Sequence, residues 1–399
     1  RSTCRRRVRS MQPWMRADST KFRASSISNW ALSIAATAAD SRRFHRNAPS
    51  DLLRVGAITG PGGHTFNIWG EKMNAPGEAM RTTGMLMTHA WCLNPDFRQQ
   101  FTEKYPEVTI VDDPREMIDQ IDGIYVDDIN AISLYPLLAR PFLQAGVPTF
   151  VNRPFATSMV KGREMVDMAQ RHGTALLSAS TWESSEGAAD LRAKAADLPD
   201  IRGYVAHNSM SDYYTHGLHG VWFIHAALCD EIARGRGPMQ AAAYHAPNWR
   251  VPGGMIVYEH EGPTQPYYGA LHMVAGDGQA YLRIFGDHQG DAEGKIPGRP
   301  GYFMYNTWNA AQLVIQEMFE TGVSPQTGGQ LLEKLAMFLL PFYSVLEADG
   351  GMVKREVLEG WELPPPSPVL MEDGQPTDSA FNFPYDEAQL EEVAKMLGG

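Results

Sequence analysis

The stretch of residues 52–65 constrains the fold more than any other part of the sequence. Residues 52–59 form an apolar run with the length of a buried strand, and a turn rich in glycine comes directly after it: Gly60, Gly62 and Gly63. A helix is predicted from about Thr65. A strand, a glycine turn and a helix in this order form the first half of a dinucleotide site, because glycines let the backbone approach a pyrophosphate closely.

The match to the dinucleotide fingerprint G-x-G-x-x-G is partial. Gly60 and Gly62 occupy its first two glycine positions, and Thr65 stands at the third. A tight turn in any α/β protein would carry the same glycines. The dinucleotide interpretation therefore depends on whether the chain after residue 65 has the pattern of a nucleotide-binding domain.

Strands and helices alternate from this turn to residue 178. The apolar runs and turn signals predict strands at 84–91, 108–111, 123–126, 148–151 and 175–178, and helices at 94–105, 114–121, 135–145 and 157–172. Such alternation is typical of a doubly wound parallel sheet. We therefore expect a Rossmann dinucleotide-binding domain over residues 51–180.

The second half of the chain has a different pattern. One more helix is predicted at 182–198, then strands at 201–208, 240–245, 254–261, 268–275 and 281–285, and helices at 220–232, 307–320, 328–347 and 385–397. The last four strands are separated by short turns, which predicts an antiparallel meander. We expect an α+β domain over residues 181–399.

Composition restricts the class of partner and the compartment. The net charge of −11 gives no general attraction to nucleic acid or anionic lipid, and no apolar run approaches the length of a membrane span. Three scattered cysteines, Cys4, Cys92 and Cys229, argue against a disulfide framework. A cytoplasmic protein with a small-molecule substrate is the expectation.

Residues 1–50 differ from the rest in charge. They hold eleven Lys or Arg and two Asp, a net charge of +9, which leaves −20 for the rest of a chain that totals −11. This Arg- and Ser-rich composition is typical of an organelle transit peptide. An extension that comes from the gene model would have the same composition, and either way we expect a leader outside the fold.

Three segments resemble the Gfo/Idh/MocA oxidoreductases. They are the opening strand with its glycine turn, residues 122–157, and His216-Gly217-Leu218-His219, which is similar to the family's D-x-G-x-H. The resemblance covers about residues 52–360. It implies a Rossmann domain and, after it, a substrate and oligomerisation domain with a largely antiparallel open sheet, in a dimer or tetramer. The implied activity is NAD- or NADP-dependent hydride transfer on a sugar, cyclitol or related polyol.

The chain departs from the family pattern in three segments. Asn152-Arg153-Pro154 stands where the family has Glu-Lys-Pro, and Thr215 stands at the aspartate of D-x-G-x-H. Arg153 keeps the charge and the donors of the lysine, but its guanidinium does not release a proton at neutral pH. Cys92 occupies the end of the second strand, where an acidic residue would bind the ribose, so NADP is not excluded.

The resemblance also implies a role for individual residues. The implied cofactor contacts are Gly60, Gly62, Gly63, His64, Thr65, Cys92, Asp127, Asp128, Asn152 and Arg153. His219 would be the catalytic base, Arg153 would orient the substrate and Asp212 would complete the catalytic set. His216, Trp182 and Tyr214 are the expected substrate contacts.

Other interpretations remain open. Asp212, His216 and His219 have a spacing that metal ligands use on a helix, but Gly217 and Gly220 disfavour a regular helix there, and no metal is expected. Some members of the family use transient oxidation to cleave glycosidic bonds. A binding protein that retains the fold without catalysis is the third interpretation.

Overall fold

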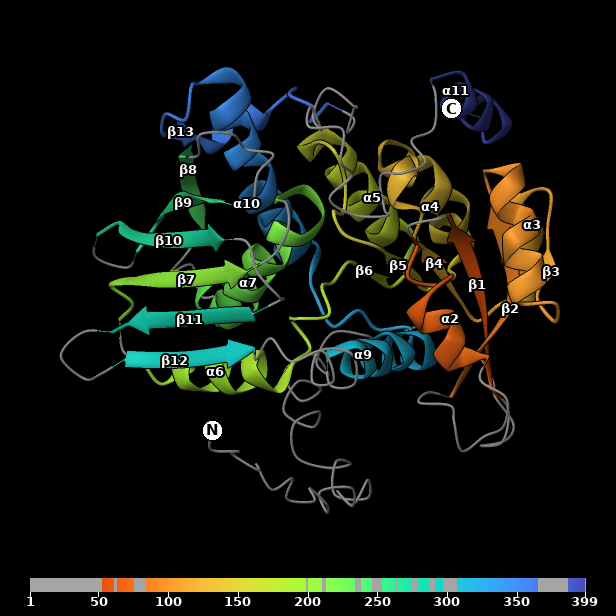
Figure 1. Cartoon of the computed structure of the whole chain (residues 1–399), viewed down its shortest axis with the longest axis horizontal. Coiled ribbons are helices and arrows are strands. Elements are labelled where there is room, and N and C mark those ends of the chain that lie inside the picture. The colour runs from red at the N-terminus through yellow and green to blue at the C-terminus, as the bar shows by residue number, and fades with distance from the viewer. Residues whose placement is uncertain are drawn as a thin grey trace, which may run out of the picture. The chain divides into compact units, whose positions relative to one another are not determined.

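A parallel sheet with the strand order β3-β2-β1-β4-β5-β6 forms the first layer of the structure, a computed structural model (Figure 1). Its strands are β1 (Leu53–Thr59), β2 (Met85–Cys92), β3 (Thr109–Ile110), β4 (Gly123–Val126), β5 (Thr149–Val151) and β6 (Leu176–Leu177). The order reverses between β1 and β4, the point at which doubly wound sheets bind their ligands. The predicted Rossmann-type sheet is confirmed.

The structure describes residues 52–60, 63–74, 84–198, 200–209, 213–233, 238–245, 253–262, 265–274, 279–286, 291–296, 307–364 and 387–398. The basic leader predicted for residues 1–50 lies outside this part of the chain, as do Gly62 and Asp212. No helix in the described ranges is both long and apolar enough to cross a membrane.

Helices cover both faces of the first sheet. They are α2 (Ile68–Met73), α3 (Pro95–Lys104), η3 (Pro114–Gln120), η4 (Ile129–Leu134), α4 (Tyr135–Ala145) and α5 (Met159–His172). The helix expected from about Thr65 begins later, because residues 64–67 form a turn. Helices α4 and α5 end at Gly146 and Gly173, whose φ angles of 79° and 64° suit glycine. Both ends agree with the sequence prediction.

A helix from the second half of the chain completes this layer. Helix α9 (Trp308–Thr321) places Trp308, Ile315 and Phe319 in one apolar cluster with β1 and β2. Gln316 accepts a hydrogen bond from the backbone of Gly84 at 2.8 Å. The first sheet is therefore buried partly by residues that are distant in sequence.

The second sheet has the order β12-β11-β7-β10-β9-β8-β13. Its strands are β7 (Gly203–Ser209), β8 (Met239–His245), β9 (Gly253–His260), β10 (Tyr267–Val274), β11 (Gln279–Phe285), β12 (Asp291–Ile296) and β13 (Val353–Lys354). The predicted meander is wrong at one step. Strand β7 lies between β10 and β11, parallel to β10 and antiparallel to β11. This placement pairs both edges of β7, whereas a continuous meander would leave β7 at an edge.

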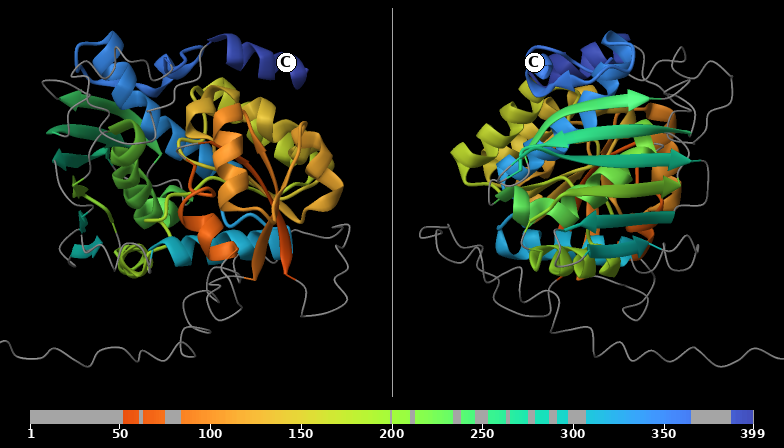
Figure 2. Two further views of the ribbon diagram at one scale, coloured as in Figure 1. Left: turned by 45° about the vertical axis from the view of Figure 1, so that its right-hand side comes forward. Right: turned by 90° about the vertical axis from the view of Figure 1, so that its left-hand side faces the viewer.

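Helices lie on one face of this sheet (Figure 2). They are α6 (Glu186–Ala196), α7 (Leu218–Ala233) and α10 (Gly328–Glu347). The sequence predicts a helix from residue 182, but α6 begins at Glu186, because the Ser185 hydroxyl accepts from the N–H of Ala188 and caps it. Residues 181–184 form a turn, which places Trp182 and Glu183 outside the helix.

Helix α10 contacts α5 on one side and β8 on the other, and it contains Pro341. Proline has no N–H, so the carbonyl of Met337 loses its helical donor. The Tyr258 hydroxyl donates to this carbonyl instead, at 3.2 Å, and the Tyr213 hydroxyl donates to the next carbonyl, that of Phe338, at 3.1 Å. The helix is thereby joined to β9 and to the turn η5 (Tyr213–Gly217). The chain continues through η7 (Arg355–Leu358) to α11 (Glu387–Met396).

Candidate active site

Polar side chains meet at the carboxyl ends of β1, β4 and β5. The carboxylate of Asp127 accepts from the N–H of Thr65 at 2.6 Å and from its hydroxyl at 2.9 Å. Its other oxygen accepts from the side-chain amide of Asn152 at 2.6 Å. Asp127 therefore joins the glycine turn to the end of β5, and it brings together three residues predicted as cofactor contacts.

Asp127 is fully buried, and burial raises the pKa of its carboxyl to about 7. The hydrogen bonds from Thr65 and the charge of Arg153 act in the opposite direction and lower the pKa. The carboxyl therefore changes protonation near neutral pH.

Arg153 lies at the centre of the site, beside a cis peptide bond to Pro154. Its Nη1 is 2.7 Å from Nε2 of His64, and its Nη2 is 2.9 Å from Nε2 of His219. A guanidinium only donates hydrogen bonds, so both imidazoles accept through Nε2. Both rings are therefore neutral in this arrangement, with their proton on Nδ1.

His219 belongs to the first turn of α7. Its Nδ1 is 2.5 Å from the hydroxyl oxygen of Ser180, and its ring stacks on that of Trp182 with centroids 5.3 Å apart. Trp182, a predicted substrate contact, thus packs directly against the predicted base. Ser180 was not predicted, although its position just after β6 places it at the same sheet edge.

The glycines of the turn are needed by the chain's own packing. A Cβ at Gly60 would overlap the carboxylate of Asp128, and a Cβ at Gly63 would overlap the hydroxyl of Thr59. Asp128 also accepts from the N–H of Asn130 at 3.1 Å, which caps η4. The predicted contact of these glycines with a pyrophosphate stays a prediction.

His64 and Cys92 occupy different surroundings. The His64 ring makes edge contacts with Trp69 and Trp308, with centroids 5.2 and 4.5 Å apart. Burial raises the pKa of the Cys92 thiol, and the charge of Asp128 raises it further. Cys92 is therefore a protonated thiol at the end of β2, and no carboxylate stands at that position.

The remaining predicted residues come from the segment before α7. Tyr214 packs in the core, with its ring against Phe338 and Phe342. The backbone of His216 lies in the π-helical turn η5, and its side chain and Asp212 are outside the described part of the structure. Gly220, expected to disfavour a regular helix, lies within α7, where a Cβ would meet the side chain of Asn208 at 2.9 Å.

Two buried hydroxyls also lie at this edge and were not predicted. Thr59 ends β1 and Tyr135 begins α4, and neither hydroxyl has a hydrogen-bond partner among the described residues. Asp127, Asp128 and Arg153 are all close enough to Tyr135 to influence the pKa of its hydroxyl, which burial raises. Only the folded chain brings these groups together.

Neither models of known protein families nor curated proteins match this sequence. Solved structures match the fold with low sequence identity. The apo scyllo-inositol dehydrogenase of Lactobacillus casei has a TM-score of 0.62 and 10% identity, over 77% of this chain and 99% of that chain. The myo-inositol dehydrogenase of the same organism, in complex with NAD(H) and myo-inositol, has a TM-score of 0.61 and 11% identity, over 76% and 96%.

GenD2 from gentamicin A biosynthesis, in complex with NAD, has a TM-score of 0.60 and 13% identity, over 78% of this chain and 98% of that chain. The chain thus shares the two-layer fold of inositol dehydrogenases and related oxidoreductases along nearly their whole length. The fold implied by the resemblance to Gfo/Idh/MocA proteins is confirmed.

Proposed function

We propose that this protein is an NAD(P)-dependent oxidoreductase that acts on a cyclitol, sugar or related polyol. The observation that carries the proposal is the pair formed by Arg153 and His219 at the carboxyl edge of the parallel sheet. The support from comparison is the fold shared with structures described as inositol dehydrogenases in complex with NAD(H).

The residues at this edge fit a dinucleotide. The strand order reverses between β1 and β4, and doubly wound sheets bind such ligands at this point. The buried hydroxyls of Thr59 and Tyr135 offer hydrogen bonds there. The carboxylate of Asp128, beside Gly60, suits a ribose hydroxyl better than a phosphate, because it accepts hydrogen bonds and carries negative charge.

A bound nicotinamide would supply the hydride acceptor or donor. Oxidation of a secondary alcohol also requires the hydroxyl to lose its proton, and Nε2 of His219 carries the lone pair that takes it. In the described structure this lone pair accepts from Arg153 at 2.9 Å. A substrate hydroxyl would have to replace this direct hydrogen bond: it would give its proton to His219 and accept a hydrogen bond from Arg153 as the carbonyl forms.

Titration calorimetry with NAD and NADP tests cofactor binding, and absorbance of the reduced nicotinamide tests turnover. The substrate panel contains myo-inositol, scyllo-inositol, aldoses and a glycoside with a chromogenic leaving group. We expect binding of one dinucleotide and its reduction by at least one polyol. Release of the aglycone without net reduction of the dinucleotide would favour transient oxidation. Binding of the dinucleotide without turnover would favour a non-catalytic role. The absence of dinucleotide binding would contradict the proposal.

The expected homo-oligomer is also a proposal. Val205, Met255 and Tyr268 lie on the neighbouring strands β7, β9 and β10 and are 45%, 40% and 53% exposed. The strand register and the alternation of buried and exposed residues put all three on the face away from the core. Helices lie on the other face of the sheet (Figure 2). We propose that a second copy of the chain covers this face. Sedimentation velocity should show an oligomer that Tyr268→Glu dissociates, and a monomeric wild-type protein would contradict this.

A further inference from the structure

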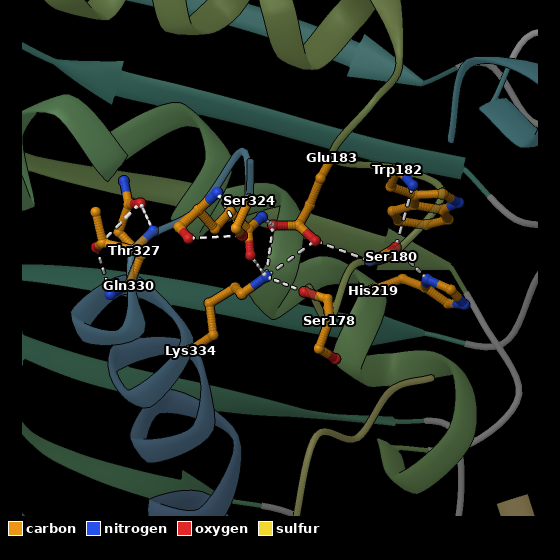
Figure 3. A network of polar contacts seen from close by, with 10 residues as sticks. Ser178, Ser180, Trp182, Glu183, His219, Ser324, Thr327, Gln330 and Lys334 are labelled. Atoms are coloured by element: carbon orange, nitrogen blue, oxygen red, sulfur yellow. Dashed lines mark hydrogen bonds and ion pairs between the residues drawn. The ribbon is translucent and has the colours of Figure 1, made fainter. Parts of the chain in front are cut away.

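A buried ion pair joins α10 to the segment after β6 (Figure 3). Nζ of Lys334 is 3.0 Å from the carboxylate of Glu183, and the two side chains are 1% and 6% exposed. Lys334 also donates to the carbonyl of Ser178 at 2.6 Å and to the side chain of Gln326 at 2.7 Å. Buried charges are tolerated when their remaining donors and acceptors are bonded in this way.

The same carboxylate holds the backbone of Ser180. Oε2 of Glu183 accepts from the N–H of Ser180 at 2.8 Å, and the N–H of Glu183 donates to the Ser180 carbonyl at 3.1 Å. Gln326 donates to Oε1 of Glu183 at 3.2 Å. The segment 180–183 is therefore attached to α10 through charge-assisted hydrogen bonds, which are stronger than neutral ones.

This segment contacts His219 from two sides. Because Arg153 donates to Nε2, the proton of the imidazole is on Nδ1 and is donated to the Ser180 hydroxyl oxygen. That oxygen also accepts from the N–H of Trp182 at 3.1 Å, which fixes its direction. The Trp182 ring stacks on the imidazole face.

We propose that Ser180 is the positioning residue of His219, and that the Glu183–Lys334 pair is its anchor. The proposal rests on the proposed function, in which His219 takes the substrate proton. A hydrogen bond from Nδ1–H to Ser180 keeps Nε2 directed at Arg153 and stabilises the imidazolium that forms when Nε2 accepts a proton. Ser180 acts through His219, not on the substrate.

The test compares Ser180→Ala with Ser344→Ala in the full chain. Ser344 is also fully buried and also bonds backbone groups, the N–H of Tyr244 and the carbonyl of Gly351, but it does not touch His219. Loss of one hydrogen bond should lower kcat of Ser180→Ala about tenfold, with the dinucleotide Kd unchanged. Ser180→Thr, which keeps the hydroxyl, should recover most of kcat.

A second readout does not need activity. Nitrogen-15 NMR of imidazole-labelled protein should show a hydrogen-bonded Nδ1–H signal for His219 in the wild type and in Ser344→Ala. The signal should be lost in Ser180→Ala, or in Ser180→Cys if the alanine variant does not fold. An unchanged signal in these variants, or its absence from the wild type, overturns the positioning role. Absence of turnover with every polyol would refute the proposed function alone.

Discussion

Arg153 donates to Nε2 of His219 across 2.9 Å and thereby links the end of β5 to the first turn of α7. The same guanidinium donates to His64 from the glycine turn. One cation therefore holds two neutral imidazoles that are far apart in sequence. A guanidinium can do this because its donors are held in a fixed planar fork, and two of them reach the two rings.

Removal of the imidazole should abolish most of the activity. His219→Ala is expected to lower turnover roughly a hundredfold or more, because general-base catalysis contributes at least this much. Dinucleotide affinity should change little, because the catalytic role assigned to His219 is toward the substrate. Steady-state kinetics and titration calorimetry measure the two effects. If turnover per folded molecule stays at the wild-type level, His219 only joins α7 to the end of β5.

Arg153→Lys tests whether both imidazoles need the paired donors of the guanidinium. A single ammonium cannot reproduce the paired donors, so one of the two imidazoles should lose its partner. We expect much of kcat to remain and the pH–rate profile to gain a second ionisation, because a lysine amine titrates more readily than a guanidinium. A profile identical to that of the wild type would contradict this interpretation.

Asp127→Asn should change how stability depends on pH. The folded pKa of about 7 lies above the unfolded value of about 3.9, so the folded state holds the proton more tightly. The contribution of Asp127 to stability is complete below the unfolded pKa and is lost as pH rises through 7. The free energy of unfolding of the wild type, relative to that of the variant, should fall by roughly 2–4 kcal/mol between pH 4 and 8.

Urea unfolding at a series of pH values measures this difference. Asparagine turns one acceptor into a donor facing Thr65 or Asn152, which adds an offset that does not vary with pH. Titration of the other carboxyl groups is common to both proteins and cancels. A difference that stays constant with pH would mean that Asp127 is ionised throughout this range.

Tyr258→Phe should destabilise the packing of α10 on the second sheet. The Tyr258 hydroxyl donates to the Met337 carbonyl that Pro341 deprives of its helical partner. Loss of this buried donor should cost about 1–3 kcal/mol. Tyr281→Phe is the matched control, because the Tyr281 hydroxyl bonds Glu293 at an exposed position. Equal free energies of unfolding for the two variants would argue against a role for the Met337 carbonyl.

Lys334→Met should be costly because it leaves the carboxylate of Glu183 buried without its cation. Breaking a buried pair in this way costs about 3–5 kcal/mol. Lys395→Met removes an exposed pair with Glu391 on α11 and should cost less than about 0.5 kcal/mol. Thermal and chemical unfolding compare the two, and a small effect of Lys334→Met would weaken the proposed anchor of Ser180.

The sequence alone was sufficient for the features that depend on neighbouring residues. Alternating apolar runs and helices predicted the parallel sheet, and the ends of α4 and α5 at Gly146 and Gly173 were predicted because glycine readily adopts a positive φ. The resemblance of residues 122–157 to a known family also led to the prediction that Arg153 and Asn152 are site residues. The structure places both beside Asp127.

Tertiary structure alone decided the pairings between distant segments. Strand β7 lies between β10 and β11, because pairing buries both of its edges, and local turn signals carry no information about that choice. Likewise Ser180 and His219 are 39 positions apart, and nothing local marks them as partners. Their contact arises because the Glu183–Lys334 pair fixes one backbone and α7 the other, and such packing is encoded by the whole chain.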